Sequence, residues 1–163
     1  MTDYRNRILG LEYINSGDLT GHPGNWREHG AAQTEALRGV LKEVGIAGAL
    51  LAYRSTRQGG ALVVIDGHLR KDAAPQQWPV LILDVDDGEA DMLLATHDPL
   101  AAMATADAGA LDALLSSVNS GEAAVMAMLA ELAESAGLYG PGEDESDAEP
   151  QIDRAEELRE KWG

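Results

Sequence analysis

The stretch of the chain that is most informative about the fold reads Ile65-Asp66-Gly67-His68-Leu69-Arg70-Lys71-Asp72-Ala73-Ala74. Its pattern predicts a buried strand that passes through a glycine into a helix with cationic side chains in the first turn. Backbone N–H groups at a helix start, a glycine and a nearby guanidinium together favour anion binding. We therefore predict a phosphate site in which Gly67 admits the phosphate, Arg70 clamps it, and His68 and Lys71 supplement the charge. The alternatives are a solvated Arg70 and a His68 that caps the helix or hydrogen-bonds within the fold.

Outward from this stretch, local patterns predict an alternation of strands and helices. Strands are expected over 7–15, 48–54, 61–66 and 79–84, and helices over 32–44, from Gly67, from near Asp87, over 108–118 and over 121–136. The apolar run Val80–Leu83 is continuous, which is typical of a strand buried on both faces in a mixed sheet. Asp86 and Asp87 are suitable N-caps for the helix that follows. The sequence thus predicts an α/β (α+β) fold, a small mixed sheet with flanking helices, followed by an Ala/Leu-rich helical part.

Composition limits the class of protein. Apolar residues make up 45% of the 163, which is enough for a core, but aromatic residues make up only 4% and phenylalanine is absent. The absence of cysteine excludes disulfides, thiolate metal sites and cysteine nucleophiles from this chain. No long apolar run follows the N-terminus, so we expect no signal peptide, no membrane span and a cytoplasmic location.

Charge is unevenly distributed along the chain. The formal net charge is −16, which weighs against a domain that binds DNA by itself through phosphate neutralisation. Nine of the twelve Lys and Arg residues lie at or before Lys71, and none lies between 72 and 153. An anion site must therefore be built mainly from the N-terminal half, where Arg27 lies in a Pro/Gly-rich loop that also holds Asn25.

The run of elements and motifs resembles the ParB/sulfiredoxin family. Gly67-His68-Leu69-Arg70, followed by Ala73-Ala74, is similar to that family's phosphate-binding box. The loop His22-Pro-Gly-Asn-Trp-Arg27 looks like its opening loop, and Asp91–Ala101 is similar to a region of ParB-like domains attached to DNA methyltransferases. The resemblance covers about residues 7–118. It implies a ParB N-terminal ("ParB-like nuclease") fold that binds a nucleoside triphosphate, with Mg²⁺, or a nucleic-acid phosphate.

Departures from the family pattern narrow the expected activity. His68 stands where sulfiredoxins carry their catalytic cysteine, so we expect no sulfiredoxin activity. Leu69 replaces the first of the two arginines usual in chromosome-partitioning ParB proteins, and Thr96-His97-Asp98 replaces their later Glu-Asn motif. No methylase motif is present, yet the final residues resemble the joint that precedes the catalytic domain in ParB–methyltransferase fusions. A methyltransferase domain or subunit is thus an expected partner.

The expected organisation has four parts. These are a ParB/sulfiredoxin-like domain over 1–106, a helical extension of the same domain over 107–138, an acidic disordered linker over 139–151, and the start of a further helix or module over 152–163.

Three readings of function remain open at this point. The first is a regulatory module in a DNA-modification or partitioning system, with Arg27 facing the box and with Asn25 and His97 as further ligand-binding residues. Asp98 would then bind ligand or orient a metal, or would serve as an N-cap before Pro99; no set of metal ligands is assigned. The second is a nuclease or nucleotide hydrolase with Asp66, His68 and Asp98 as candidate catalytic residues. The third is an assembly domain that forms a homodimer through the helices of Ala108–Ala136.

Overall fold

The computed structural model describes residues 2–138, which form two compact units. The first unit contains the residues up to His29 together with Ile46–Ala104, and the second contains Gly30–Gly45 together with the chain from Thr105. The predicted linker and the predicted terminal module, residues 139–163, lie outside the described residues.

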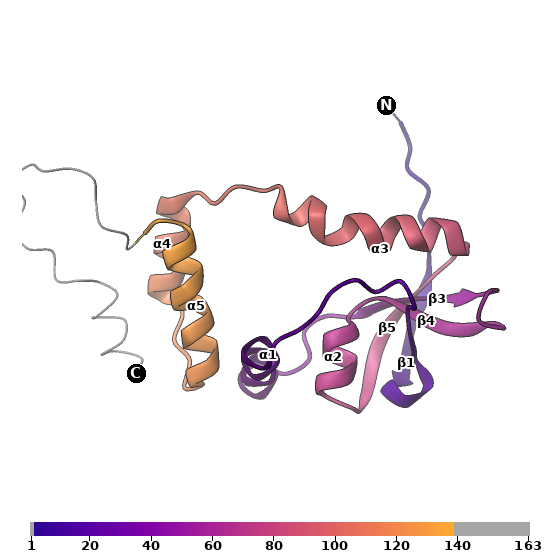
Figure 1. Ribbon diagram of the computed structural model, residues 1–163, viewed down its shortest axis with the longest axis horizontal. Coiled ribbons are helices and arrows are strands. Elements are labelled where there is room, and N and C mark those ends of the chain that lie inside the picture. Colours follow the sequence, from indigo (N-terminus) through magenta and orange to yellow (C-terminus); the bar gives the residue numbers. More distant parts are fainter. Residues whose placement is uncertain (1, 139–163) are drawn as a thin grey trace, which may run out of the picture. The chain divides into compact units, whose positions relative to one another are not determined.

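The first unit is built on a five-stranded mixed sheet with the order β1-β5-β3-β4-β2 (Figure 1). The strands are β1 (Ile8–Asn15), β2 (Thr20–Gly21), β3 (Leu50–Ser55), β4 (Ala61–Asp66) and β5 (Gln77–Leu83). β1 pairs antiparallel with β5, β5 pairs parallel with β3, and β3 and β4 form an antiparallel hairpin. The mixed sheet confirms the fold class, and the interior place of β5, between β1 and β3, explains the continuous apolar run from Val80.

Helix α3 (Asp87–Ala102) lies along one face of this sheet (Figure 1). Ala90 of α3 is buried in a cluster with Tyr53, Val63, Ile65 and Leu83. The helix begins at a capping box, in which the Asp86 side chain accepts from the Glu89 backbone N–H and the Glu89 side chain accepts in return from Asp86. The predicted N-terminal cap is therefore confirmed.

Two shorter elements complete the first unit. A 3₁₀ turn, η1 (Ser16–Asp18), leads into β2, and helix α2 (His68–Ala73) follows β4 through Gly67. β2 was not expected from the sequence, because its two residues Thr20 and Gly21 form a strand only by pairing with Val63 and Val64.

Within the described residues, the second unit contains three helices, α1 (Ala31–Glu43), α4 (Ala108–Ser117) and α5 (Ala123–Ser135). α1 and α5 cross closely at Gly39, where an added Cβ would lie 2.7 Å from Val125 Cγ2 and 2.9 Å from Glu122 Cβ. Glu43 of α1 caps the start of α5, since its Oε1 accepts from the Ser120 hydroxyl at 2.6 Å and from Gly121 N–H at 2.7 Å. These bonds lower the pKa of the Glu43 carboxyl.

Among the described residues, no helix has the length and apolar character that crossing a membrane requires.

Candidate phosphate site at the junction of β4 and α2

Gly67 joins β4 to α2 in a conformation that favours glycine. Its φ is +107°, and a Cβ built at this position would lie 2.3 Å from Leu50 Cδ2. A side chain here would therefore meet both backbone strain and the buried Leu50. The glycine of the predicted box is required by the fold itself, whatever the junction binds.

His68 follows Gly67 and is only 7% exposed. Its Nε2 accepts a hydrogen bond from the backbone N–H of His22 at 3.0 Å. Burial, with a smaller contribution from the charge of Arg27, lowers the pKa of His68 from 6.5 to about 4. The ring is therefore neutral at pH 7, and because Nε2 accepts, the proton lies on Nδ1. Nδ1 is buried and has no hydrogen-bond partner among the described residues.

Arg27, from the loop before α1, lies near enough to His68 for its charge to act on the ring. One terminal nitrogen, Nη1, pairs with Asp98 Oδ2 at 2.6 Å. Its Nε is buried and, within residues 2–138, lacks a hydrogen-bond partner. The structure thus brings together two of the predicted phosphate ligands, and each retains one unpaired buried N–H.

The other predicted cations are paired with neighbouring acids. Arg70 Nη2 lies 3.1 Å from Asp66 Oδ2, and Arg70 Nη1 lies 3.5 Å from the carbonyl oxygen of Ala49. Lys71 Nζ lies 2.8 Å from Asp72 Oδ1. A ligand that recruits Arg70 or Lys71 must therefore compete with a carboxylate already in place.

The remaining predicted ligand-binding residues flank this junction. His97 Nε2 lies 3.7 Å from Asp66 Oδ1, on the carboxylate that also holds Arg70. Asn25 Oδ1 accepts a hydrogen bond from the backbone N–H of Arg27 at 3.5 Å, and this bond lies within the loop that carries Arg27.

Asp98 does not cap a helix. α3 continues through Asp98 and Pro99 to Ala102, so the interpretation of Asp98 as an N-cap is wrong. The reason is tertiary: the Asp98 carboxylate pairs with Arg27 Nη1 instead of a backbone N–H, and the Leu94 carbonyl, one turn earlier, accepts from Trp26 of the same loop. The described residues contain no group of three or more His, Asp or Glu side chains placed to hold a metal ion.

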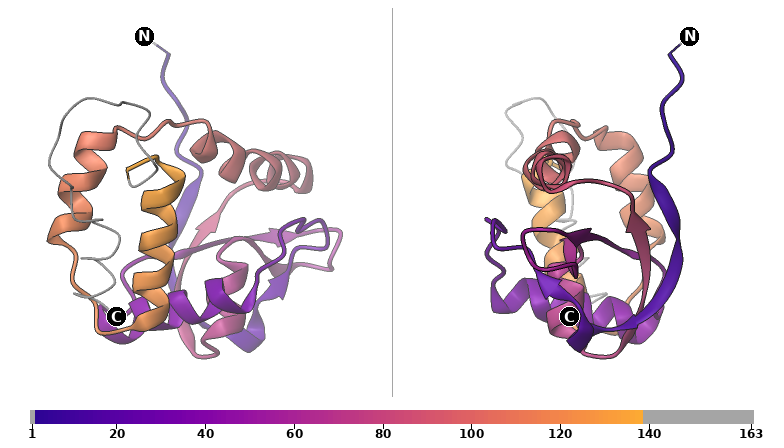
Figure 2. Two further views of the ribbon diagram at one scale, coloured as in Figure 1. Left: turned by 60° about the vertical axis from the view of Figure 1, so that its left-hand side comes forward. Right: turned by 90° about the vertical axis from the view of Figure 1, so that its right-hand side faces the viewer.

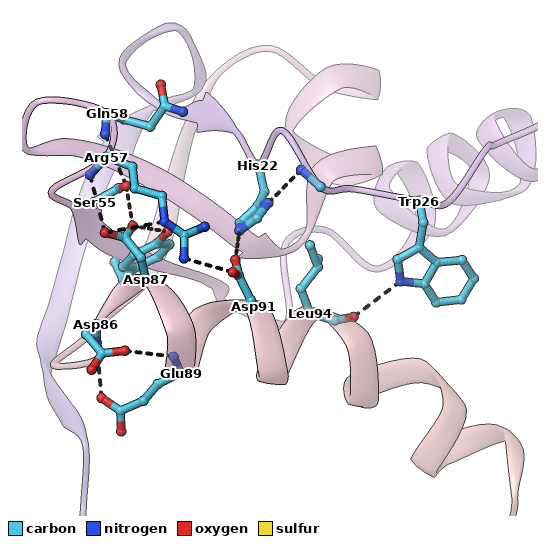
Figure 3. Close-up of polar contacts among 12 residues, drawn as sticks. His22, Trp26, Ser55, Arg57, Gln58, Asp86, Asp87, Glu89, Asp91 and Leu94 are labelled. Atoms are coloured by element: carbon cyan, nitrogen blue, oxygen red, sulfur yellow. Dashed lines mark hydrogen bonds and ion pairs between the residues drawn. The ribbon is translucent and has the colours of Figure 1, made fainter.

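Helix α3 fixes the loop that carries Arg27, through one face of the helix (Figure 3). His22 Nε2 donates to Asp91 Oδ1 at 3.1 Å, while His22 Nδ1 accepts from Gly24 N–H at 2.8 Å. Trp26 Nε1 donates to the Leu94 carbonyl at 3.4 Å. Asp91, Leu94 and Asp98 are three and four residues apart and therefore share a face. Neither His22 nor Asp91 was predicted as a site residue, although this spacing is visible in the sequence.

Asp87 anchors the first turn of α3 to the β3–β4 hairpin (Figure 3). Its carboxylate accepts hydrogen bonds from the hydroxyls of Ser55, Thr56 and Tyr53 and from the Arg57 backbone N–H. These donors, Ser55 first, hold the pKa of Asp87 well below its usual range. Arg57 also reaches Asp91 at 2.9 Å, so the hairpin, α3 and the loop at His22 form one polar network.

Comparison with known proteins identifies the fold. No protein-family model matches the chain, and no curated protein matches it. Among solved structures it is similar to the C-terminally truncated chromosome-partitioning protein ParB from Caulobacter crescentus complexed with CTP-gamma-S. That match has a TM-score of 0.55 at 17% identity and covers 76% of this chain and 79% of that chain. A Pnob8-like ParB-N domain gives a TM-score of 0.43 at 18% identity over 80% of this chain, which spans about half (49%) of that chain.

Proposed function

Because the chain has the mixed α/β fold of ParB N-terminal domains, we propose that it binds the phosphate groups of a nucleotide where β4 meets α2. The proposed ligands are Gly67, His68, Arg70 and Lys71, with Arg27 from the first loop. The similar ParB structure was solved with a CTP analogue, which supports a nucleotide as the class of ligand.

The observation that carries the proposal is the pair of buried N–H groups at His68 Nδ1 and Arg27 Nε. A buried donor that lacks an acceptor costs about 1–3 kcal/mol, so most such groups in native proteins are satisfied. A phosphate oxygen is a strong acceptor of the kind that each of these donors lacks. Helix α2 is only six residues long, so its N-terminus is not counted among the phosphate ligands.

Charge explains how such a ligand would be held. Asp98, Asp66 and Asp72 neutralise Arg27, Arg70 and Lys71 in the absence of ligand. A triphosphate presents several negative charges at once and would compete with all three carboxylates, with Mg²⁺ bound to the nucleotide itself. Binding should therefore weaken as the salt concentration rises.

The finer part of the proposal concerns the partner. A net charge of −16 makes direct binding to duplex DNA unfavourable, so the nucleotide signal would pass to a DNA-acting partner. We place the chain as the regulatory module of a partitioning system or of a DNA methyltransferase.

The experiment is calorimetric titration of the full chain with CTP, ATP and GTP, with and without Mg²⁺. In the variant Arg27→Lys the charge facing Asp98 is kept but the Nε–H is lost, so we expect at least a tenfold loss of affinity. Arg54→Lys, an exposed arginine of β3, is the matched control and should bind as the parent does. Equal affinity in parent and Arg27→Lys, or no saturable binding by the parent, would contradict the proposal.

A further inference from the structure

His22 lies at the start of the loop that carries Arg27, and it is also bonded to His68. Its backbone N–H donates to His68 Nε2 at 3.0 Å. Its carbonyl oxygen accepts from the backbone N–H of Asn25 at 3.0 Å, and its ring Nδ1 accepts from that of Gly24 at 2.8 Å. Asn25 in turn accepts from the backbone N–H of Arg27. His22 therefore joins the two residues whose buried N–H groups lack a partner within the described chain.

The imidazole ring of His22 fits its surroundings in one tautomer. The side chain is only 5% exposed. Because Nδ1 accepts from Gly24, the ring proton lies on Nε2, which faces Asp91 Oδ1 at 3.1 Å. A Cβ added at Gly24 would lie 3.2 Å from the ring, so the loop closes tightly on the imidazole. A proton on Nδ1 would set two donors against each other, and the turn at Gly24 would have to open.

Asp91 is the group that selects this tautomer. Helix α3 lies alongside both the loop at His22 and the β3–β4 hairpin (Figure 2), and Asp91 lies between His22 and Arg57 (Figure 3). The hydrogen bond from Arg57 lowers the pKa of the Asp91 carboxyl, which is therefore ionised at pH 7. An ionised carboxylate only accepts hydrogen bonds, so Nε2 of His22 must donate to it.

We propose that Asp91 and His22 are positioning residues of the phosphate site. The carboxylate orients the imidazole, and the imidazole holds the loop so that the Arg27 Nε–H stays buried near His68. Neither side chain binds the phosphate itself, because both ring nitrogens of His22 are already bonded and Asp91 is negatively charged. The effect on ligand binding rests on the proposed function, whereas the placement of Arg27 is a property of the free protein.

Hydrogen exchange of the Arg27 Nε–H in the free protein tests this placement, by ¹⁵N NMR, with Arg27→Lys identifying the resonance by its loss. Burial should protect this proton from exchange. In Asp91→Ala the exchange should be faster by about tenfold or more, the equivalent of one hydrogen bond to a charged group. Asp91→Asn keeps an acceptor oxygen for His22 and should stay within about threefold of the parent. Equal exchange in the parent and Asp91→Ala would overturn the proposal.

Calorimetric titration with CTP, ATP and GTP in the presence of Mg²⁺ tests the consequence for binding. Asp91→Ala should weaken binding about tenfold, and Asp91→Asn should restore it. Met92→Ala, which truncates an exposed neighbour on the same helix, is the matched control and should bind as the parent does. In His22→Asn, the Oδ1 keeps an acceptor for Gly24 but the shorter side chain loses the bond to Asp91. Adding Asp91→Ala to His22→Asn should therefore weaken binding no further.

The outcomes distinguish the positioning role from the phosphate site itself. Nucleotide binding that Asp91→Ala leaves unchanged would refute the positioning role and leave the phosphate site standing. A parent that binds no nucleotide, with faster exchange of the Arg27 Nε–H in Asp91→Ala, would refute the proposed function and support the positioning role. Asp91→Ala and Asp91→Asn both lose the charge that faces Arg57. Equal losses in these two variants would therefore assign the effect to that charge instead of the bond to His22, and would overturn the proposal.

Discussion

The two ring nitrogens of His68 have different roles. Nε2 holds the loop by accepting from His22, and Nδ1 carries a buried proton with no partner in the described part of the chain. Both roles require a neutral ring. Protonation would remove the acceptor at Nε2 and place a charge in a buried site.

This state of His68 predicts a dependence of stability on pH. The pKa of His68 is about 4 in the folded protein against 6.5 for an unperturbed histidine, so the unfolded chain binds more protons between these values. Stability should therefore fall as pH falls from about 6.5 to about 4, with a limiting slope of about 1.4 kcal/mol per pH unit for one proton.

Urea unfolding between pH 7 and pH 4.5 measures this slope, and His68→Asn serves as the comparison. The variant should lose less stability over the interval than the parent, whatever its stability at pH 7. Parallel curves for the two proteins would show that His68 is not buried in the neutral form.

Gly67 supports a second prediction at the same scale. Gly67→Ala adds a methyl group 2.3 Å from Leu50 Cδ2 at a φ of +107°, and should destabilise the chain by about 2–5 kcal/mol from strain and overpacking together. Gly60→Ala, at a φ of +86° with open space around it, should lose only about 1–2 kcal/mol. Chemical denaturation distinguishes the two, and similar losses would contradict the clash with Leu50.

Residue-scale features divide into those that sequence can reveal and those that it cannot. Gly67, His68 and Arg70 were predicted because the box is local. The unpaired Nδ1 of His68 was not predicted, because it depends on which atoms of residues 22 and 27 lie next to the imidazole ring. The network of Asp87 with Tyr53, Ser55 and Thr56 was missed for the same reason, because it joins residues about 30 positions apart.

At the scale of elements, helices and strands with local signals were predicted well. The Asp86 capping box and the stop of α1 before Gly45, which has a φ of +95°, are set by nearby residues. β2 and the continuation of α3 through Pro99 were not predicted; β2 depends on its pairing with the distant strand β4. Proline normally ends a helix, and local rules therefore favoured a break at Asp98.

The crossing of α1 and α5 gives a prediction at this scale. Gly39→Ala should gain up to about 1 kcal/mol of helix propensity but lose more through contact with Val125 and Glu122, for a net loss of about 1–2 kcal/mol. Gly109→Ala in α4, where the nearest atom lies at 3.6 Å, should be neutral or stabilising. Thermal unfolding of both variants checks the sign, and a stabilising Gly39→Ala would contradict the close crossing.

At the scale of the whole molecule, seven ion pairs join basic side chains of this acidic chain to carboxylates. Each of these cations within residues 2–138 has a carboxylate partner: Arg7, Arg27, Arg38, Lys42, Arg57, Arg70 and Lys71. An incoming phosphate must exchange with such pairs, so a multiply charged ligand is favoured over a singly charged one. The sequence predicted the cations and their N-terminal clustering, but it did not predict that each would be paired.

The most direct test of the phosphate site is ¹⁵N NMR of the histidine rings during titration with a nucleoside triphosphate at pH 7. In the free protein, His68 should show a protonated Nδ1 and an unprotonated Nε2. We predict that saturating nucleotide shifts the His68 Nδ1–H resonance, with no matching change in Arg27→Lys at the same concentration. A nucleotide that binds while the His68 Nδ1–H resonance stays in place would contradict the account.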